Sequence, residues 1–116
     1  MARFTHLPIY KKSFGLLVMI EELVLSMERK SRYTIGSDLR NIFRSFITNI
    51  SRVNGLENKY RKAYIEKMFD EINQVYILLS VMKELKLFTK SNQYEIILEE
   101  IFNIEKQLEG WKKSMK

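Results

Sequence analysis

Apolar residues recur every three or four positions in the second quarter of the chain. They are Ile35, Leu39, Ile42, Phe43, Phe46, Ile47, Ile50 and Val53. At about 100° per residue, this spacing places them on one arc of a helix, with polar residues opposite. The pattern therefore predicts an amphipathic helix over residues 35–53 that buries its apolar arc.

Similar periodicity extends over the rest of the chain. It predicts three further helices, over about residues 9–28, 57–88 and 92–112. The 116 residues include only one Pro and four Gly, which argues against a turn-rich β fold. Amphipathic helices joined by short connections are typical of an antiparallel up-and-down bundle. We therefore expect an all-α, single-domain four-helix bundle that spans residues 1–116.

Local sequence signals set the expected helix ends. Asn54-Gly55 is a strong stop signal at the end of the amphipathic helix. Thr34 is the expected N-cap of that helix, with Ser37 as the alternative. Ser91 is expected to cap the last helix, and residues 29–33 are then left as a short connection.

Two runs of five apolar residues go all the way round their helices. They are Leu16–Ile20 and Val75–Leu79. Five successive positions at about 100° each leave no polar side, so such a helix needs burial on more than one side. In a chain this short, a subunit interface is the simplest second side. The two runs therefore predict self-association.

Positive charge is concentrated between Arg29 and Lys62. That stretch holds nine Lys or Arg against Asp38 and Glu57, a net charge of +7, whereas the whole chain carries +6. Such concentration is typical of a protein that binds a polyanion. The helix over residues 35–53 would carry three of these arginines on the arc opposite its apolar side.

A solvated surface is the alternative interpretation of these charges, since most charged helix faces serve only to keep a helix in water. Such a face usually carries both signs, and here acids are nearly missing, which favours nucleic-acid binding. The residues that we expect to contact nucleic acid are Arg29, Lys30, Arg32, Arg40, Arg44, Arg52 and Lys59.

Residues suited to catalysis or metal binding are scarce. The chain has no Cys and one His, His6, and it has no P-loop or GxGxxG motif. Glu95 with Glu99, and Glu105 with Glu109, could suggest a di-iron site, but that site also needs Glu-x-x-His partners on facing helices. We therefore expect no catalytic residue, no metal and no cofactor. No signal-peptide core and no apolar run of about 20 residues is present, so we expect a cytoplasmic protein without a membrane partner.

Three segments resemble one family of small helical proteins. Arg32-Tyr33-Thr34-Ile35-Gly36 precedes Asp38-Leu39-Arg40, and Lys86-Leu87-Phe88-Thr89-Lys90-Ser91-Asn92-Gln93-Tyr94 joins the last two predicted helices. The chain then runs from Ile101 through Leu108 to Gly110-Trp111-Lys112-Lys113-Ser114. Together these segments resemble the accessory variability determinant (Avd) proteins of diversity-generating retroelements, from about Pro8 to Ser114. The sequence departs from that family in having no Pro in residues 27–30 and Glu109 where a first Gly is common.

The resemblance implies a four-helix bundle assembled as a homopentameric ring. It implies partners as well, namely a reverse transcriptase and its template RNA or cDNA. Such a protein supports mutagenic retrohoming and catalyses nothing itself. The chain is similar, less closely, to the four-helix-bundle proteins encoded in 23S rRNA intervening sequences. That relationship leaves open the alternative of an oligomeric scaffold that binds a protein partner.

Overall fold

The computed structural model describes residues 4–115, most of which are helical. In chain order the elements are α1 (Pro8–Leu25), α2 (Arg29–Ser31), η1 (Arg32–Gly36), α3 (Ser37–Gly55), α4 (Asn58–Glu84) and α5 (Gln93–Lys113). The element η1 is a π-helical turn, and the others are α-helices. No strand occurs in the part of the chain that is described, so the prediction of an all-α fold is confirmed.

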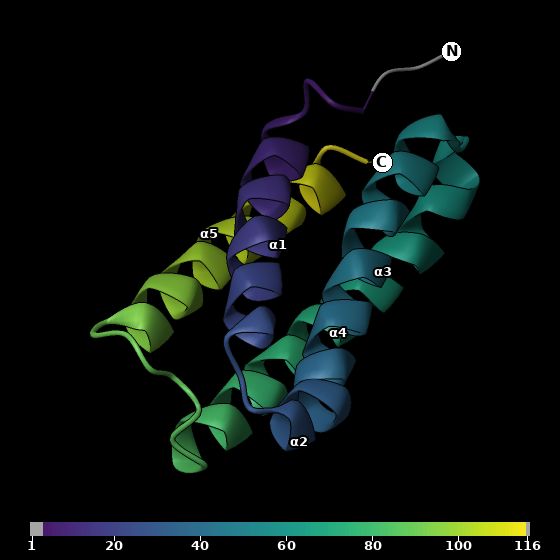
Figure 1. The fold of residues 1–116 in the computed structure, drawn as a ribbon. Helices are drawn as coiled ribbons and strands as arrows, with labels where there is room; N and C mark the ends of the chain where they lie inside the picture. Colours follow the sequence, from purple (N-terminus) through teal and green to yellow (C-terminus); the bar gives the residue numbers. More distant parts are fainter. Residues whose placement is uncertain (1–3, 116) are drawn as a thin grey trace.

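The four long helices enclose one core. α1 packs against α3 and α5, and α4 packs against the same two helices, so α1 and α4 lie diagonally opposite each other. The molecule is elongated, with extents of 44 × 22 × 22 Å. The start of α1, the α3–α4 junction and the end of α5 all lie toward one end of it (Figure 1).

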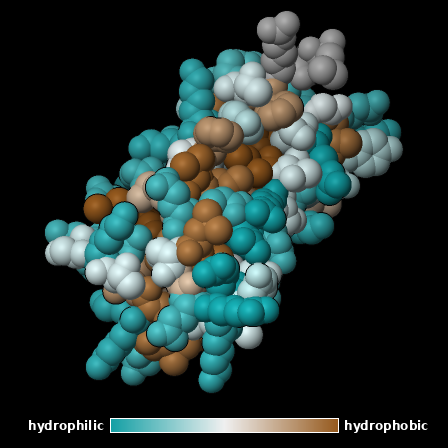
Figure 2. Space-filling view, viewed as in Figure 1, coloured by the Kyte–Doolittle hydropathy of each residue, from teal (hydrophilic) through white to brown (hydrophobic). Residues whose placement is uncertain are grey.

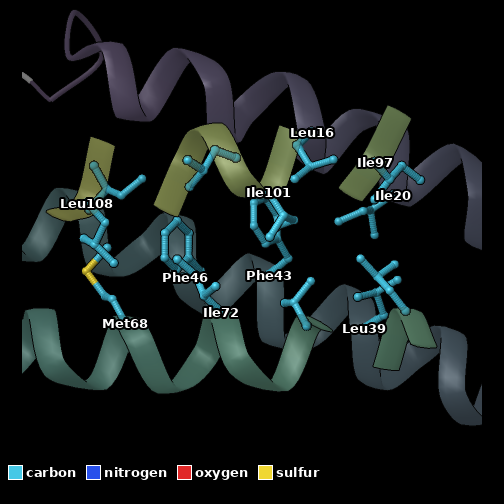
Figure 3. Packing of buried hydrophobic residues seen from close by; sticks show 14 of the residues in the cluster. Leu16, Ile20, Leu39, Phe43, Phe46, Met68, Ile72, Ile97, Ile101 and Leu108 are labelled. Carbon is cyan, nitrogen blue, oxygen red and sulfur yellow. The ribbon is translucent and has the colours of Figure 1, made fainter. Parts of the chain in front are cut away.

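Aliphatic and aromatic side chains from all four helices meet along the bundle axis (Figure 3). Fully buried examples are Leu16 and Ile20 of α1, Leu39, Phe43 and Phe46 of α3, Met68 and Ile72 of α4, and Ile97, Ile101 and Leu108 of α5. The Phe43 and Phe46 rings stack with their centroids 5.4 Å apart. Burying each side chain of this size contributes about 1.5–3 kcal/mol. The apolar arc predicted for residues 35–53 is therefore the side of α3 that faces the core.

The prediction that residues 29–33 form a connection is wrong, because α2 and η1 lead into α3 without a break. Neither Thr34 nor Ser37, the two residues predicted as the N-cap, makes a side-chain capping hydrogen bond at the start of α3. Thr34 Oγ1 instead donates back to the Lys30 carbonyl at 2.8 Å, within the preceding turn. Gly36 sits in the wide turn against the end of α1, where an added Cβ would lie 3.0 Å from Met27 Sδ and 3.1 Å from Val24 Cγ1. The absence of a side chain at Gly36 therefore lets the π turn pack closely on α1.

The predicted helix over residues 57–88 is four residues too long at its C-terminus, because α4 ends at Glu84. Lys86 adopts a left-handed backbone with φ 59°. The Leu87 N–H bonds the Met82 carbonyl at 3.0 Å, and the Lys86 N–H bonds the Lys83 carbonyl at 3.0 Å. These two bonds form a Schellman motif, which satisfies carbonyls at the helix end without a glycine.

The start of α5 differs by one residue from the prediction. Asn92, not Ser91, is the residue that precedes the helix, and its φ is 64°. Asn tolerates this left-handed backbone better than most residues. The α3–α4 turn agrees with the Asn54-Gly55 stop signal, since α3 ends at Gly55.

Candidate nucleic-acid interface

Arg44, one of the arginines predicted to face nucleic acid, forms a fork with Glu21 of α1. Its Nε donates to Oε2 at 2.6 Å, and its Nη2 donates to Oε1 at 2.8 Å. These hydrogen bonds are the main reason that the pKa of Arg44 is raised. Arg40 lies at the same carboxylate, with Nε 3.8 Å from Oε1, and is only 20% exposed. The carboxylate that pairs with these two arginines is thus supplied by a neighbouring helix.

Arg52 points toward the other side of α3. Its Nη1 lies 3.5 Å from Oδ1 of Asn49, whose Nδ2 donates to the buried Glu71 of α4 at 2.9 Å. The Ser45 hydroxyl donates to the second oxygen of Glu71. Arg52 is exposed and lies at the edge of this polar network. The sequence predicted that the three α3 arginines lie on one arc, as a line of free guanidiniums. In the structure they do not form such a line.

Arg29, Lys30 and Arg32 lie before α3, at the opposite end of that helix from Lys59. The Arg29 guanidinium carbon is 5.8 Å from the centre of the exposed Tyr33 ring. Arg32 is partly buried and its Nη2 donates to the Met27 carbonyl at 3.1 Å, which ties η1 to the preceding loop. Of these three residues, Arg29 and Lys30 are the exposed ones.

Lys59 borders an open pocket of about 370 Å³ between the first turns of α4 and the end of α5. The lining residues are Asn58, Lys59, Lys62, Lys112 and Met115, and none of them is acidic. The Lys59 ammonium is 3.8 Å from Glu57, and both side chains are more than 60% exposed, at 67% and 76%. A pair this exposed is held weakly, because water and salt screen it. The ammonium groups of Lys59 and Lys62 are therefore open to an anion here.

Lys112 reaches this pocket from the far end of the chain. Its ammonium is 2.7 Å from Glu66 Oε1. Hydrogen bonding and charge from Lys112, with a further contribution from Lys62, lower the pKa of Glu66. The seven residues that the sequence predicted to contact nucleic acid include Lys59 but not Lys62 or Lys112. The spacing of Lys59 and Lys62 by three positions could have indicated a shared helix face, whereas Lys112 joins them only through the fold.

The two apolar runs each leave a stripe of exposed apolar side chains. On α1, Val18 of the run continues into a stripe with Phe14 and Leu25. On α4, Ile77 of the run continues into a stripe with Val81 and with Leu85, which directly follows the helix. Leu25 and Ile77 are each 63% exposed. Apolar side chains reach the surface in patches on the face that carries α1 (Figure 2). Each run is thus buried on its core side and open on its outer side within one chain.

A groove along α3 and α4 continues the α4 stripe. Ile42, Ile77 and Leu78 line one part of it, and Ile35, Val81, Leu85 and Leu87 line the other. Lys30 and Asp38 are among the polar residues that border it. This apolar lining differs from the lysine-lined pocket at the start of α4.

Within residues 4–115, no three His, Cys, Asp or Glu side chains are grouped closely enough to hold a metal ion. None of the helices described there combines the length and apolar character needed to cross a membrane. No family model matches the chain, and no curated protein matches it. The resemblance to the Avd family therefore stands on the residues given for it above.

Proposed function

We propose that this protein is a non-catalytic, nucleic-acid-binding accessory protein of a diversity-generating retroelement. It acts in the cytoplasm with the reverse transcriptase of the element during mutagenic retrohoming. The observation that carries the proposal is the pocket lined by Lys59, Lys62 and Lys112, with no acid in its lining. Clustered cations on one surface are the electrostatic footprint of a protein that binds phosphate backbones.

The proposed assembly is an antiparallel up-and-down bundle repeated as a homopentamer. The contacts of α1 and α4 with both α3 and α5 support this topology, because each helix then packs on its neighbours in sequence and α5 returns to α1. The apolar stripes on α1 and α4 support self-association, since exposed apolar patches often mark interaction sites. A ring repeats each basic pocket around its axis.

The proposed role in copying is to hold template RNA or cDNA beside the reverse transcriptase. Ammonium groups contact phosphate oxygens as point charges and carry no information about base sequence. Binding to RNA and DNA is then largely independent of sequence. No step of the copying reaction passes through a side chain of this protein.

Fluorescence anisotropy with labelled RNA and DNA oligonucleotides tests the binding. Affinity should be similar for unrelated sequences and should fall steeply from low to moderate salt, because each neutralised phosphate releases counterions. Absence of binding at low salt would overturn the proposal. Co-purification with the co-expressed reverse transcriptase tests the partner, and a control bait of similar charge excludes simple ionic capture.

A second candidate function is an oligomeric scaffold for a protein partner. The apolar groove that Ile42, Leu78, Val81 and Leu85 line favours it, because amphipathic helices dock into grooves of this kind. The scaffold and the nucleic-acid binder differ in their response to salt. Apolar docking persists as salt rises, whereas phosphate binding weakens.

A further inference from the structure

Surface charge is distributed differently from the sequence-based expectation. Two of the three α3 guanidiniums, those of Arg40 and Arg44, already lie at the Glu21 carboxylate. An incoming phosphate must compete with that carboxylate for them. By contrast, Lys62 has no ion pair among the described residues, and the Lys59 pair is highly exposed. Lys112 pairs with Glu66 at 2.7 Å, but Lys59 and Lys62 leave positive charge open to a ligand where α4 starts and α5 ends.

Tyr60 adds an exposed aromatic ring beside these lysines. It is 53% exposed, and the Lys59 ammonium lies 5.0 Å from the centre of its ring. Lys59 also lines the pocket, so the ring and the pocket share one side chain. Proteins that bind single strands without sequence preference combine a basic groove with aromatic rings on which bases stack. A duplex keeps its bases paired and stacked, so it cannot use such a ring in this way.

We propose that the start of α4 and the end of α5 form a binding site for single-stranded nucleic acid. Lys59, Lys62 and Lys112 bind consecutive phosphates, and Tyr60 stacks on an unpaired base. Binding draws Lys112 from Glu66, whose carboxylate is well exposed and returns to water. The flexible stems of lysine suit the irregular backbone of a single strand. This assignment rests on the proposed nucleic-acid function and places its main contact away from the α3 arginines.

Two triple variants with the same change in net charge test the location. One replaces the pocket lysines (Lys59→Gln, Lys62→Gln and Lys112→Gln), and the other replaces the α3 arginines (Arg40→Gln, Arg44→Gln and Arg52→Gln). The lysine variant should flatten the salt slope by about 2, since each single-strand phosphate contact contributes about 0.7. That corresponds to an affinity loss of up to about 100-fold at 0.1 M salt. A larger loss in the arginine variant would overturn the proposed site.

The aromatic contact has a closely matched control. Tyr60→Ala should weaken single-strand binding by about tenfold and leave duplex binding nearly unchanged, because stacking on a base is worth about 1–3 kcal/mol. Tyr33→Ala removes a ring that is 64% exposed and also lies near a cation, Arg29, but at the opposite end of α3. It should leave single-strand affinity unchanged. Equal effects of the two variants would contradict a role for Tyr60.

A titration with inorganic phosphate separates failure of this site from failure of the proposed function. Amide NMR signals of residues 58–62 and 110–115 should shift with phosphate in the wild type and not in the lysine variant. If phosphate shifts these signals but oligonucleotides do not bind, the anion site holds and the nucleic-acid function fails. If oligonucleotides bind and these signals stay fixed under both ligands, the function holds and the proposed site is wrong. Circular dichroism of each variant confirms that it is folded.

Discussion

Arg44 of α3 and Glu21 of α1 are joined by two hydrogen bonds, at 2.6 and 2.8 Å. The planar fork of the guanidinium matches both carboxylate oxygens, so the pair fixes one helix against the other. A residue that the sequence assigns to nucleic acid thus has a structural partner. Half of the Arg44 side chain remains exposed, so water and salt limit what the pair contributes.

A double-mutant cycle measures that contribution. Arg44→Gln and Glu21→Gln, alone and combined, should give a coupling free energy of about 0.5–1 kcal/mol in urea unfolding. The coupling should shrink in 1 M salt, where the screening length falls to about 3 Å. Each single variant should keep its helicity, because the apolar side of α3 is unchanged. A coupling near zero at low salt would mean that the pair has no structural role.

Gly36 and Gly15 make a matched pair of substitutions. Gly36→Ala should destabilise the fold by about 1–3 kcal/mol, because its Cβ would meet the Ser31 carbonyl as well as Val24 and Met27 within 3.1 Å. Gly15→Ala, in the middle of α1 with nothing within 4 Å, should stabilise the fold by about 0.5–1 kcal/mol. Chemical denaturation of both variants checks these opposite signs. Equal changes in the free energy of unfolding would mean that the close packing at η1 leaves room for a methyl group at residue 36.

Tyr76 should titrate later than an ordinary tyrosine. Burial, followed by the hydrogen bond that its hydroxyl donates to Glu105 at 2.7 Å, raises the pKa of Tyr76 above its usual value. The pKa of Tyr76 is higher in the folded protein than the unfolded value of about 10. The stabilisation that the protonated hydroxyl contributes is therefore complete below about pH 10 and is lost as pH rises further. An ultraviolet titration of the six tyrosines should show one late transition, which Tyr76→Phe removes. At neutral pH the same variant should cost about 1 kcal/mol. A high-pH part of the titration curve that Tyr76→Phe leaves unchanged would contradict this prediction.

The α4 stripe should control self-association. Ile77→Gln with Leu85→Gln replaces two well-exposed apolar side chains, at 63% and 59%, and should lower the sedimentation coefficient. Folding should be retained because neither side chain belongs to the buried core. Lys67→Gln, an exposed change elsewhere on α4, is the control and should sediment like the wild type. A wild-type monomer at micromolar concentration would remove the basis for the assembly.

The sequence predicted much of the secondary structure because helical periodicity is a local property. Leu39, Phe43, Phe46 and Ile50 are spaced by three or four, and all four are fully buried. The helical structure of residues 29–33 escaped prediction because the support for this turn comes from α1, through the contact of Gly36 with Val24 and Met27. Nothing within the segment itself indicates that contact.

The predicted site was less complete, since charge interactions depend on which helices are neighbours. The apparent lack of acids around Arg44 came from counting charges along one segment, whereas Glu21 lies 23 positions earlier and across the α1–α3 seam. Lys112 was missing from the predicted set, because only the fold brings it to Glu66 near the start of α4. Of the residues predicted to contact nucleic acid, only Lys59 lines the lysine pocket at the start of α4.

The placement of the apolar stripes limits which assemblies can cover them. Because α1 and α4 are diagonally opposite in the bundle, their outer stripes point away from each other. A second copy that docks one of its own stripes on one stripe of the first leaves the remaining stripe of each copy uncovered. A pair of chains therefore leaves half of this apolar surface in water, whatever its symmetry. In a head-to-tail assembly, the α1 stripe of one copy contacts the α4 stripe of the next. Such an assembly covers every stripe only when it closes into a ring, and otherwise it continues as a filament.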